Sequence, residues 1–248
     1  MRGHIMSGRG TSAEKIQQKG ISQKMKKLYF LMLFLFPVLM PAEVKTLVDV
    51  DFSKEKDLSG WQFWDKKKFP ECFKIQEGIL RTSPKELGGL SMTLPQTVEI
   101  NKSVKKVVMK VEMKQIKNPA RIITFALSTA KTPCPGYAAP FRNPGEGGVY
   151  FSVCYFNSQN HQKMGWRNAG KEVIRTRPAL KPFNMTDADQ WVTLTFTIDN
   201  EKKILTLQSS LGRSFSLHNV DLDGMTLNSL FIPAMGVSYK TVKFSVEK

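Results

Sequence analysis

The sequence predicts an all-β protein, built as a two-sheet antiparallel sandwich, and three observations predict this class. Apolar and polar residues alternate with period two in several segments of residues 43–248. Turn-forming residues separate these segments, and no amphipathic run of helical length occurs among them. Period-two alternation is typical of half-buried strands, and turn signals about 8–12 residues apart favour a sandwich over alternating strands and helices.

Residues 25–42 read MKKLYFLMLFLFPVLMPA and precede the alternating segments. Two lysines, an apolar run and the small residue Ala42 follow one another in the order of a secretory signal peptide. The apolar run is shorter than the roughly 20 residues that a membrane span needs. We therefore expect an exported protein that is periplasmic, cell-surface or extracellular. The alternative is that the leader is not cleaved and stays as an N-terminal anchor. Such an anchor is the one way in which we expect the protein to attach to a membrane.

Residues 1–24 are polar and do not fit the leader pattern. We expect translation to start at Met25, with residues 1–24 belonging to an over-long gene prediction. Residues 43–248 are then a single domain, of ordinary size for a β-sandwich.

The predicted domain is basic, but its charges are interspersed. It carries 30 basic and 20 acidic residues, a net charge of +10. Nucleic-acid binders more often show a long basic stripe or a recognisable module, so we expect no nucleic-acid partner. No glycine-rich phosphate loop lies between a strand and a helix, so no nucleotide partner is expected either. Attraction to an anionic polysaccharide or a lipid headgroup layer fits the composition better.

The expected strands are placed by their alternate apolar residues, each set predicted to share one face. In chain order the sets are Thr46, Val48, Val50 and Phe52; Val107, Met109, Val111 and Met113; Val149, Phe151, Val153 and Tyr155; Val192, Leu194, Phe196 and Ile198; and Val242, Phe244 and Val246. Asp199 and Asn200 predict a hairpin turn after the fourth set. The segment Lys131–Gly148 holds four prolines and four glycines, and a loop of this length is either functional or disordered.

Six short motifs follow one another along the predicted domain: Asp51-Phe52, Gly60-Trp61, Ile75 with Gly78 and Leu80, Gly147–Phe151, Asp189–Leu194 and Val242–Val246. They resemble motifs of the concanavalin A-like lectin/glucanase domains (LamG-type jelly rolls) of bacterial exported proteins. The resemblance covers nearly all of residues 43–248 and implies a jelly roll whose last strand pairs with its first. It also implies carbohydrate binding, with the glycan on the concave sheet and its adjoining loops.

Aromatic and amide side chains gather in residues 150–167 and in the proline-rich loop. Aromatic rings stack on the apolar faces of sugars, while amides and guanidinium groups bind sugar hydroxyls. Trp166 is the strongest candidate because polar residues flank it, whereas Trp61 and Trp191 are expected in the core or at its rim. The predicted ligand-binding residues are Trp166, Tyr150, Phe156, Asn157, Asn160, His161, Arg167, Tyr137 and Arg142.

No catalytic residues are predicted, and the sequence favours a binding protein over an enzyme. Glucanases of this fold carry a pattern E-x-D-x-x-E, which the chain lacks, and Glu55-Lys56-Asp57 is its nearest approach. The companion motifs of alginate lyases of this fold are missing as well. A glycoside hydrolase or polysaccharide lyase with an unrecognised site stays open as an alternative, and so does a protein-interaction or structural domain.

The sequence predicts no metal site and no cofactor. A calcium site is kept as the alternative. Two pairs of carboxylates stand two residues apart, Asp187 with Asp189 and Asp221 with Asp223, and each resembles half of a calcium site. Solvated turns are the favoured interpretation of both. The three cysteines allow at most one internal disulfide. Two alternatives stay open: a disulfide between Cys134 and Cys154, or three unbridged thiols that include Cys72.

Overall fold

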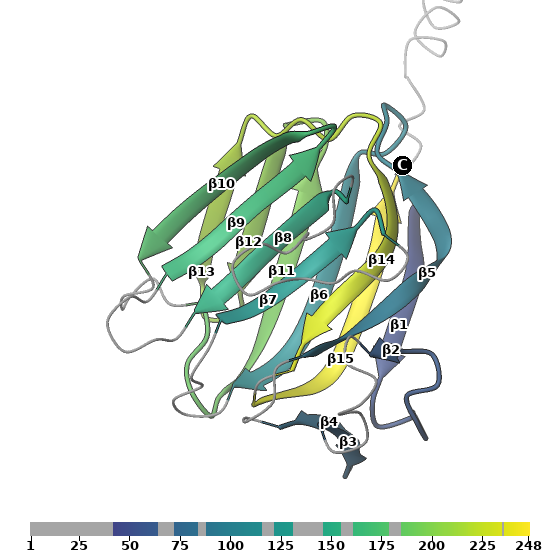
Figure 1. Cartoon of the computed structure of the whole chain (residues 1–248), viewed down its shortest axis with the longest axis vertical. Coiled ribbons are helices and arrows are strands. Elements are labelled where there is room, and N and C mark those ends of the chain that lie inside the picture. The colour runs from purple at the N-terminus through teal and green to yellow at the C-terminus, as the bar shows by residue number, and fades with distance from the viewer. Residues whose placement is uncertain are drawn as a thin grey trace, which may run out of the picture. The chain divides into compact units, whose positions relative to one another are not determined.

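Two antiparallel sheets stacked face to face build the domain (Figure 1). A computed structural model of the chain describes residues 42–63, 72–83, 88–115, 122–130, 146–154, 161–178, 185–234 and 236–248. Residues Ala42–Lys248 form one unit. The described residues include no helix, so none that is long and apolar enough to cross a membrane. The all-β, two-sheet prediction is therefore confirmed.

The first sheet has eight strands and contains both the first and the last strand of the domain. Its last strand pairs along one side with the first strand, from Val44↔Glu247 to Asp51↔Thr241, as the resemblance implied. The spatial order is β13 (Arg213–His218), β12 (Ile204–Ser209), β11 (Trp191–Asp199), β6 (Lys106–Gln115), β15 (Val237–Glu247), β4 (Ile79–Thr82) and β3 (Phe73–Gln76), with β1 (Val44–Asp51) also on β15.

The second sheet has seven strands, and Figure 1 shows β7 to β10 side by side. Three of its strand pairs, β9–β10, β8–β9 and β7–β8, join neighbours in the sequence. The spatial order is β10 (Lys171–Pro178), β9 (His161–Asn168), β8 (Gly148–Cys154), β7 (Ile122–Ser128), β14 (Thr226–Pro233), β5 (Gly89–Glu99) and β2 (Gln62–Phe63).

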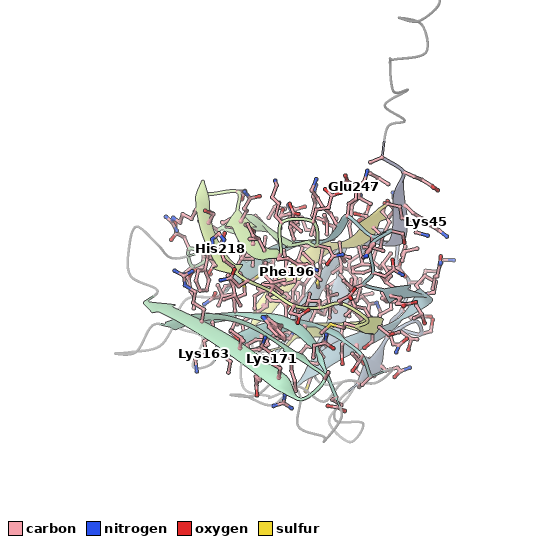
Figure 2. All side chains as sticks on the ribbon, turned by 90° about the horizontal axis from the view of Figure 1, so that it is seen from above. Lys45, Lys163, Lys171, Phe196, His218 and Glu247 are labelled. Atoms are coloured by element: carbon pink, nitrogen blue, oxygen red, sulfur yellow. The ribbon has the colours of Figure 1, made fainter. Side chains whose placement is uncertain are left out.

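The apolar residues of each strand point between the sheets, as their alternation predicted. The sets on β6, β8, β11 and β15 are all buried at the residues that the structure describes. Phe151 stacks on Phe125 at 4.7 Å between ring centroids and on Phe196 at 5.0 Å, which joins the two sheets. Figure 2 shows Phe196 between the two layers. Burial of these rings and aliphatic chains is the main source of stability for such a sandwich.

Two further sequence expectations have different outcomes. The hairpin at Asp199 and Asn200 is confirmed, and the Asn200 amide donates hydrogen bonds of 3.0 Å to the carbonyls of Asn101 and Val104. Thr46 was expected on the face of Val48, but it is exposed. The pairing register shifts between Thr46 and Val48, which is a β-bulge that breaks the alternation at this point.

Candidate functional site

A small cluster on the outer face of the seven-stranded sheet is separate from the main core. We use outer face for the side of a sheet turned away from the other sheet. The cluster consists of Ala126 on β7, Tyr150 on β8 and Phe231 on β14. Val149 and Phe151 point into the core, so Tyr150 between them points outward. All three cluster residues are at most 4% exposed.

Two glycines allow the aromatic rings of this cluster to lie close to the backbone of neighbouring strands. A Cβ at Gly165 of β9 would come within 2.8 Å of the Tyr150 ring and 2.6 Å of the Val173 carbonyl oxygen. A Cβ at Gly89 of β5 would overlap the Phe231 ring. These close approaches require glycine at both positions.

A charged pair lies next to Tyr150 on the same outer face. Arg167 of β9 and Glu172 of β10 are cross-strand partners, and their side chains form an ion pair at 2.8 Å between Nη2 and Oε2. The two side chains are 26% and 30% exposed. Burial raises the pKa of the Tyr150 phenol, Glu172 raises this pKa further, and Arg167 acts in the opposite direction. The phenol therefore stays protonated at neutral pH.

Hydroxyl groups extend the polar part of this face toward β7. Thr124 and Ser152 are opposite each other in the β7–β8 pair, and their side-chain oxygens are 2.8 Å apart in a hydrogen bond. Both residues are buried. The outer face thus combines two aromatic rings, a hydroxyl pair and one partly exposed Arg–Glu pair. This set can donate and accept hydrogen bonds but carries little net charge.

Two of the predicted ligand-binding residues, Tyr150 and Arg167, come together on this face. A third, Trp166, is on the inner face of the same sheet. Tyr150 and Arg167 share the outer face on adjacent strands. Trp166 is 1% exposed and belongs to the core, so the expectation that it is exposed was wrong. It pairs with the core residue Val149 and shares its face. Its polar neighbours did not indicate exposure, because Gln162 on the same face is buried too.

The remaining predicted site residues lie outside what the structure describes. His161 begins β9, but its side chain is not among the described ones. The other residues outside the described ranges are Tyr137, Arg142, Phe156, Asn157 and Asn160.

Glu172 and Gly165 are site residues that the sequence reasoning missed. A signal for Glu172 was available in Ala169-Gly170, which joins β9 and β10 as a two-residue hairpin with positive φ at both positions. Gly at the second position of such a turn is a strong hairpin signal, and the pairing it sets places Glu172 opposite Arg167. No local signal marks Gly165, because its role depends on a ring from another strand.

The other two described tryptophans lie in the core or at its rim, as expected. Trp61 is buried and stacks on Phe52, with 6.1 Å between ring centroids. Trp191 is partly buried on the eight-stranded sheet, with the Lys114 and Lys240 ammonium groups 5.4 and 4.3 Å from its ring centroid.

Of the carboxylates considered for calcium, that of Asp187 has a cationic partner, whereas Asp221 and Asp223 accept hydrogen bonds at their backbone oxygens. Asp187 forms an ion pair with Arg213 at 3.2 Å. The Asn168 amide donates to the carbonyl oxygens of Asp221 and Asp223 at 3.4 and 3.2 Å. Within the described ranges, no three His, Cys, Asp or Glu side chains gather as metal ligands. Of the cysteines, Cys72 is buried, while Cys134 and the side chain of Cys154 lie outside those ranges.

Comparison with known proteins connects this fold to carbohydrate-recognition domains. No protein-family model and no curated protein matches the chain. Among solved structures, the exoplasmic/lumenal domain of VIP36 in its Ca²⁺/Man3GlcNAc-bound form is 12% identical, with TM-score 0.56 over 82% of this chain and 89% of that one. The carbohydrate recognition domain of Emp47p is 13% identical, with TM-score 0.53 over 82% and 96%. The Bacillus licheniformis β-glucanase is 11% identical, with TM-score 0.50 over 83% and 98%.

At these identities the likeness concerns the fold. The domain has a two-sheet antiparallel jelly-roll fold of the concanavalin A-like type, and the solved structures that share this fold include a carbohydrate recognition domain and a β-glucanase. The resemblance predicted from the sequence motifs is thereby confirmed at the level of the fold.

Proposed function

We propose that the chain is an exported, lectin-like carbohydrate-binding protein, with its glycan on the outer face of the seven-stranded sheet. The observation that carries this proposal is the Arg167–Glu172 ion pair beside Tyr150, partly exposed on that face. A guanidinium next to a carboxylate offers donors and acceptors in fixed positions, which suits the hydroxyl pattern of a sugar. The likeness of the fold to the carbohydrate recognition domain of Emp47p and to the Man3GlcNAc-bound domain of VIP36 supports the same function.

The protonation state of Tyr150 favours binding over base chemistry. A tyrosine that takes a proton from a sugar must lose its own proton near the working pH. Burial and the nearby Glu172 raise the pKa of Tyr150, so its phenol remains a hydrogen-bond donor. Arg167 and Glu172 are the more exposed groups, and we place the direct glycan contacts on them.

The test is a glycan-array screen of the full chain, with and without calcium, beside two matched variants. Arg167→Ala removes the proposed contact. Arg81→Ala removes an arginine of β4 that forms an equivalent ion pair with Glu77 at 2.9 Å on the other sheet. We expect selective glycan binding that the Arg167 variant loses and the Arg81 variant keeps. Loss of an exposed ion pair itself costs about 0–1 kcal/mol of stability, so both variants should fold.

Two results would contradict the proposal. Binding that survives Arg167→Ala would remove the glycan from this face, and no binding to any glycan by the folded protein would favour the interaction-domain alternative. Trp166→Ala is unsuitable as a probe, because emptying a buried tryptophan site costs about 3–5 kcal/mol. Export has its own test: mass spectrometry of the native protein should find Glu43 at the N-terminus, and a retained leader would contradict it.

A further inference from the structure

The outer face of the eight-stranded sheet carries a row of polar side chains in register. Lys110 of β6 is opposite Thr195 of β11, Thr195 is opposite Gln208 of β12, and Gln208 is opposite Ser214 of β13. Directly opposite residues have Cβ atoms about 4.5–5.5 Å apart. The row, which we call the Lys110 row, therefore crosses four strands at right angles. Its members are exposed or partly exposed.

An open hollow of about 450 Å³ lies along the same row. Its lining offers hydroxyl, amide and guanidinium groups and, among the described residues, no aliphatic or aromatic side chain. These groups come from Thr193, Thr195, Gln208, Ser210, Arg213 and Ser214. Such a lining can hydrogen-bond a polar ligand.

Three other lysines of this face are paired with carboxylates, whereas no carboxylate among the described residues pairs with Lys110. Lys243 pairs with Asp49 at 2.9 Å, Lys240 pairs with Glu112 at 3.0 Å, and Lys106 pairs with Glu247 at 3.4 Å. Lys110 has no ion pair within the described part of the chain, and the side chains of Thr195 and Gln208 make no hydrogen bond there. Lys243 is directly opposite Lys110, but its charge is compensated by Asp49.

We propose that the Lys110 row is a binding site for an acidic saccharide. The Lys110 ammonium would hold a carboxylate or sulfate group by a charge-assisted hydrogen bond. Thr195 and Gln208 would bind the hydroxyls of the same chain, and the hollow would receive its next sugar. This site is on the sheet opposite to the one proposed above and does not depend on glycan binding there.

The experiment measures the affinity of the full chain for oligogalacturonate by calorimetry at low and at raised salt. The same oligosaccharide with methyl-esterified carboxylates serves as the uncharged comparison. Lys110→Gln and Gln208→Ala change the row. Lys74→Gln removes an equally exposed lysine from β3, at the far edge of the same sheet, and is the matched control.

We expect Lys110→Gln to weaken oligogalacturonate binding about tenfold, the size of one charge-assisted hydrogen bond. Gln208→Ala should weaken binding of both oligosaccharides, and Lys74→Gln should change neither. The part of the binding that Lys110→Gln removes should remain in Arg167→Ala, which separates this site from the one on the other sheet.

Three results would overturn the inference. Equal weakening by Lys110→Gln and Lys74→Gln would mean general charge attraction, and loss of binding in Arg167→Ala would mean a single site on the other sheet. No binding by the folded chain would rule out the acidic saccharide. Vesicles with anionic headgroups, used as a competing probe, should not displace the oligosaccharide, and displacement would assign the row to a lipid surface.

Discussion

Single residues determine how closely the aromatic rings approach the backbone on the outer face of the seven-stranded sheet. Tyr150 lies against Gly165 on the next strand, and Phe231 lies against Gly89. Each contact uses the space that a Cβ would fill. The two glycines therefore have a packing role that their own positions in β9 and β5 do not reveal.

We expect Gly165→Ala to destabilise the domain by about 1–3 kcal/mol, because the new methyl would meet a backbone carbonyl oxygen 2.6 Å away. Urea unfolding monitored by fluorescence measures this difference. Gly88→Ala is the control, since no atom lies within 4 Å of a Cβ at Gly88. Equal stability of the two variants would show that the Tyr150 ring moves away without cost.

At the scale of elements, a strand has one face in the core and one face available for function. β11 shows this division clearly. Val192, Leu194, Phe196 and Ile198 are buried, whereas Thr193, Thr195 and Thr197 are partly exposed on the other face. Adjacent positions on one strand should therefore respond to substitution in opposite ways.

We expect Leu194→Ala to cost about 2–5 kcal/mol, since it leaves a cavity at a fully buried position. Thr195→Ala should change stability by less than about 0.5 kcal/mol, because its side chain packs against no core residue. Chemical denaturation of both variants tests the pair. A large loss for Thr195→Ala would contradict the assignment of this face to ligand binding.

At the scale of the whole molecule, one core joins the two sheets, and the two ends of the domain pair within the eight-stranded sheet. β1 pairs with β15. The core is one cluster of buried apolar side chains, and strands of both sheets contribute to it. Such long-range pairing favours one cooperative transition over separate unfolding of the sheets. It also predicts slow folding, in milliseconds to seconds.

We therefore expect tryptophan fluorescence and far-ultraviolet circular dichroism to report the same unfolding midpoint. Trp166 monitors the seven-stranded sheet and Trp191 the eight-stranded one. Variants that keep only Trp166 or only Trp191, with Phe at the other three tryptophans, would separate the two signals. Two midpoints would show that the sheets unfold independently.

The sequence by itself determined the class of the fold and the inward face of most strands. Period-two alternation is a local property, so Val107 to Met113 and Val192 to Ile198 could be assigned to a buried face without a structure. Thr46 and Trp166 were the failures. A bulge changed the alternation at Thr46, and polar flanking residues concealed the inward direction of Trp166.

Outward residues become neighbours either through a local turn or through the pairing of distant strands, and the second kind follows from the tertiary structure alone. Arg167 and Glu172 meet across a short hairpin, and a closer interpretation of Ala169-Gly170 would have paired them. Lys110 comes opposite Thr195 through two strands that are far apart in the chain. Register between such strands depends on the summed packing of both sheets, and a shift by one residue would turn every side chain to the other face. No local pattern contains that information, so the Lys110 row became visible only in the folded domain.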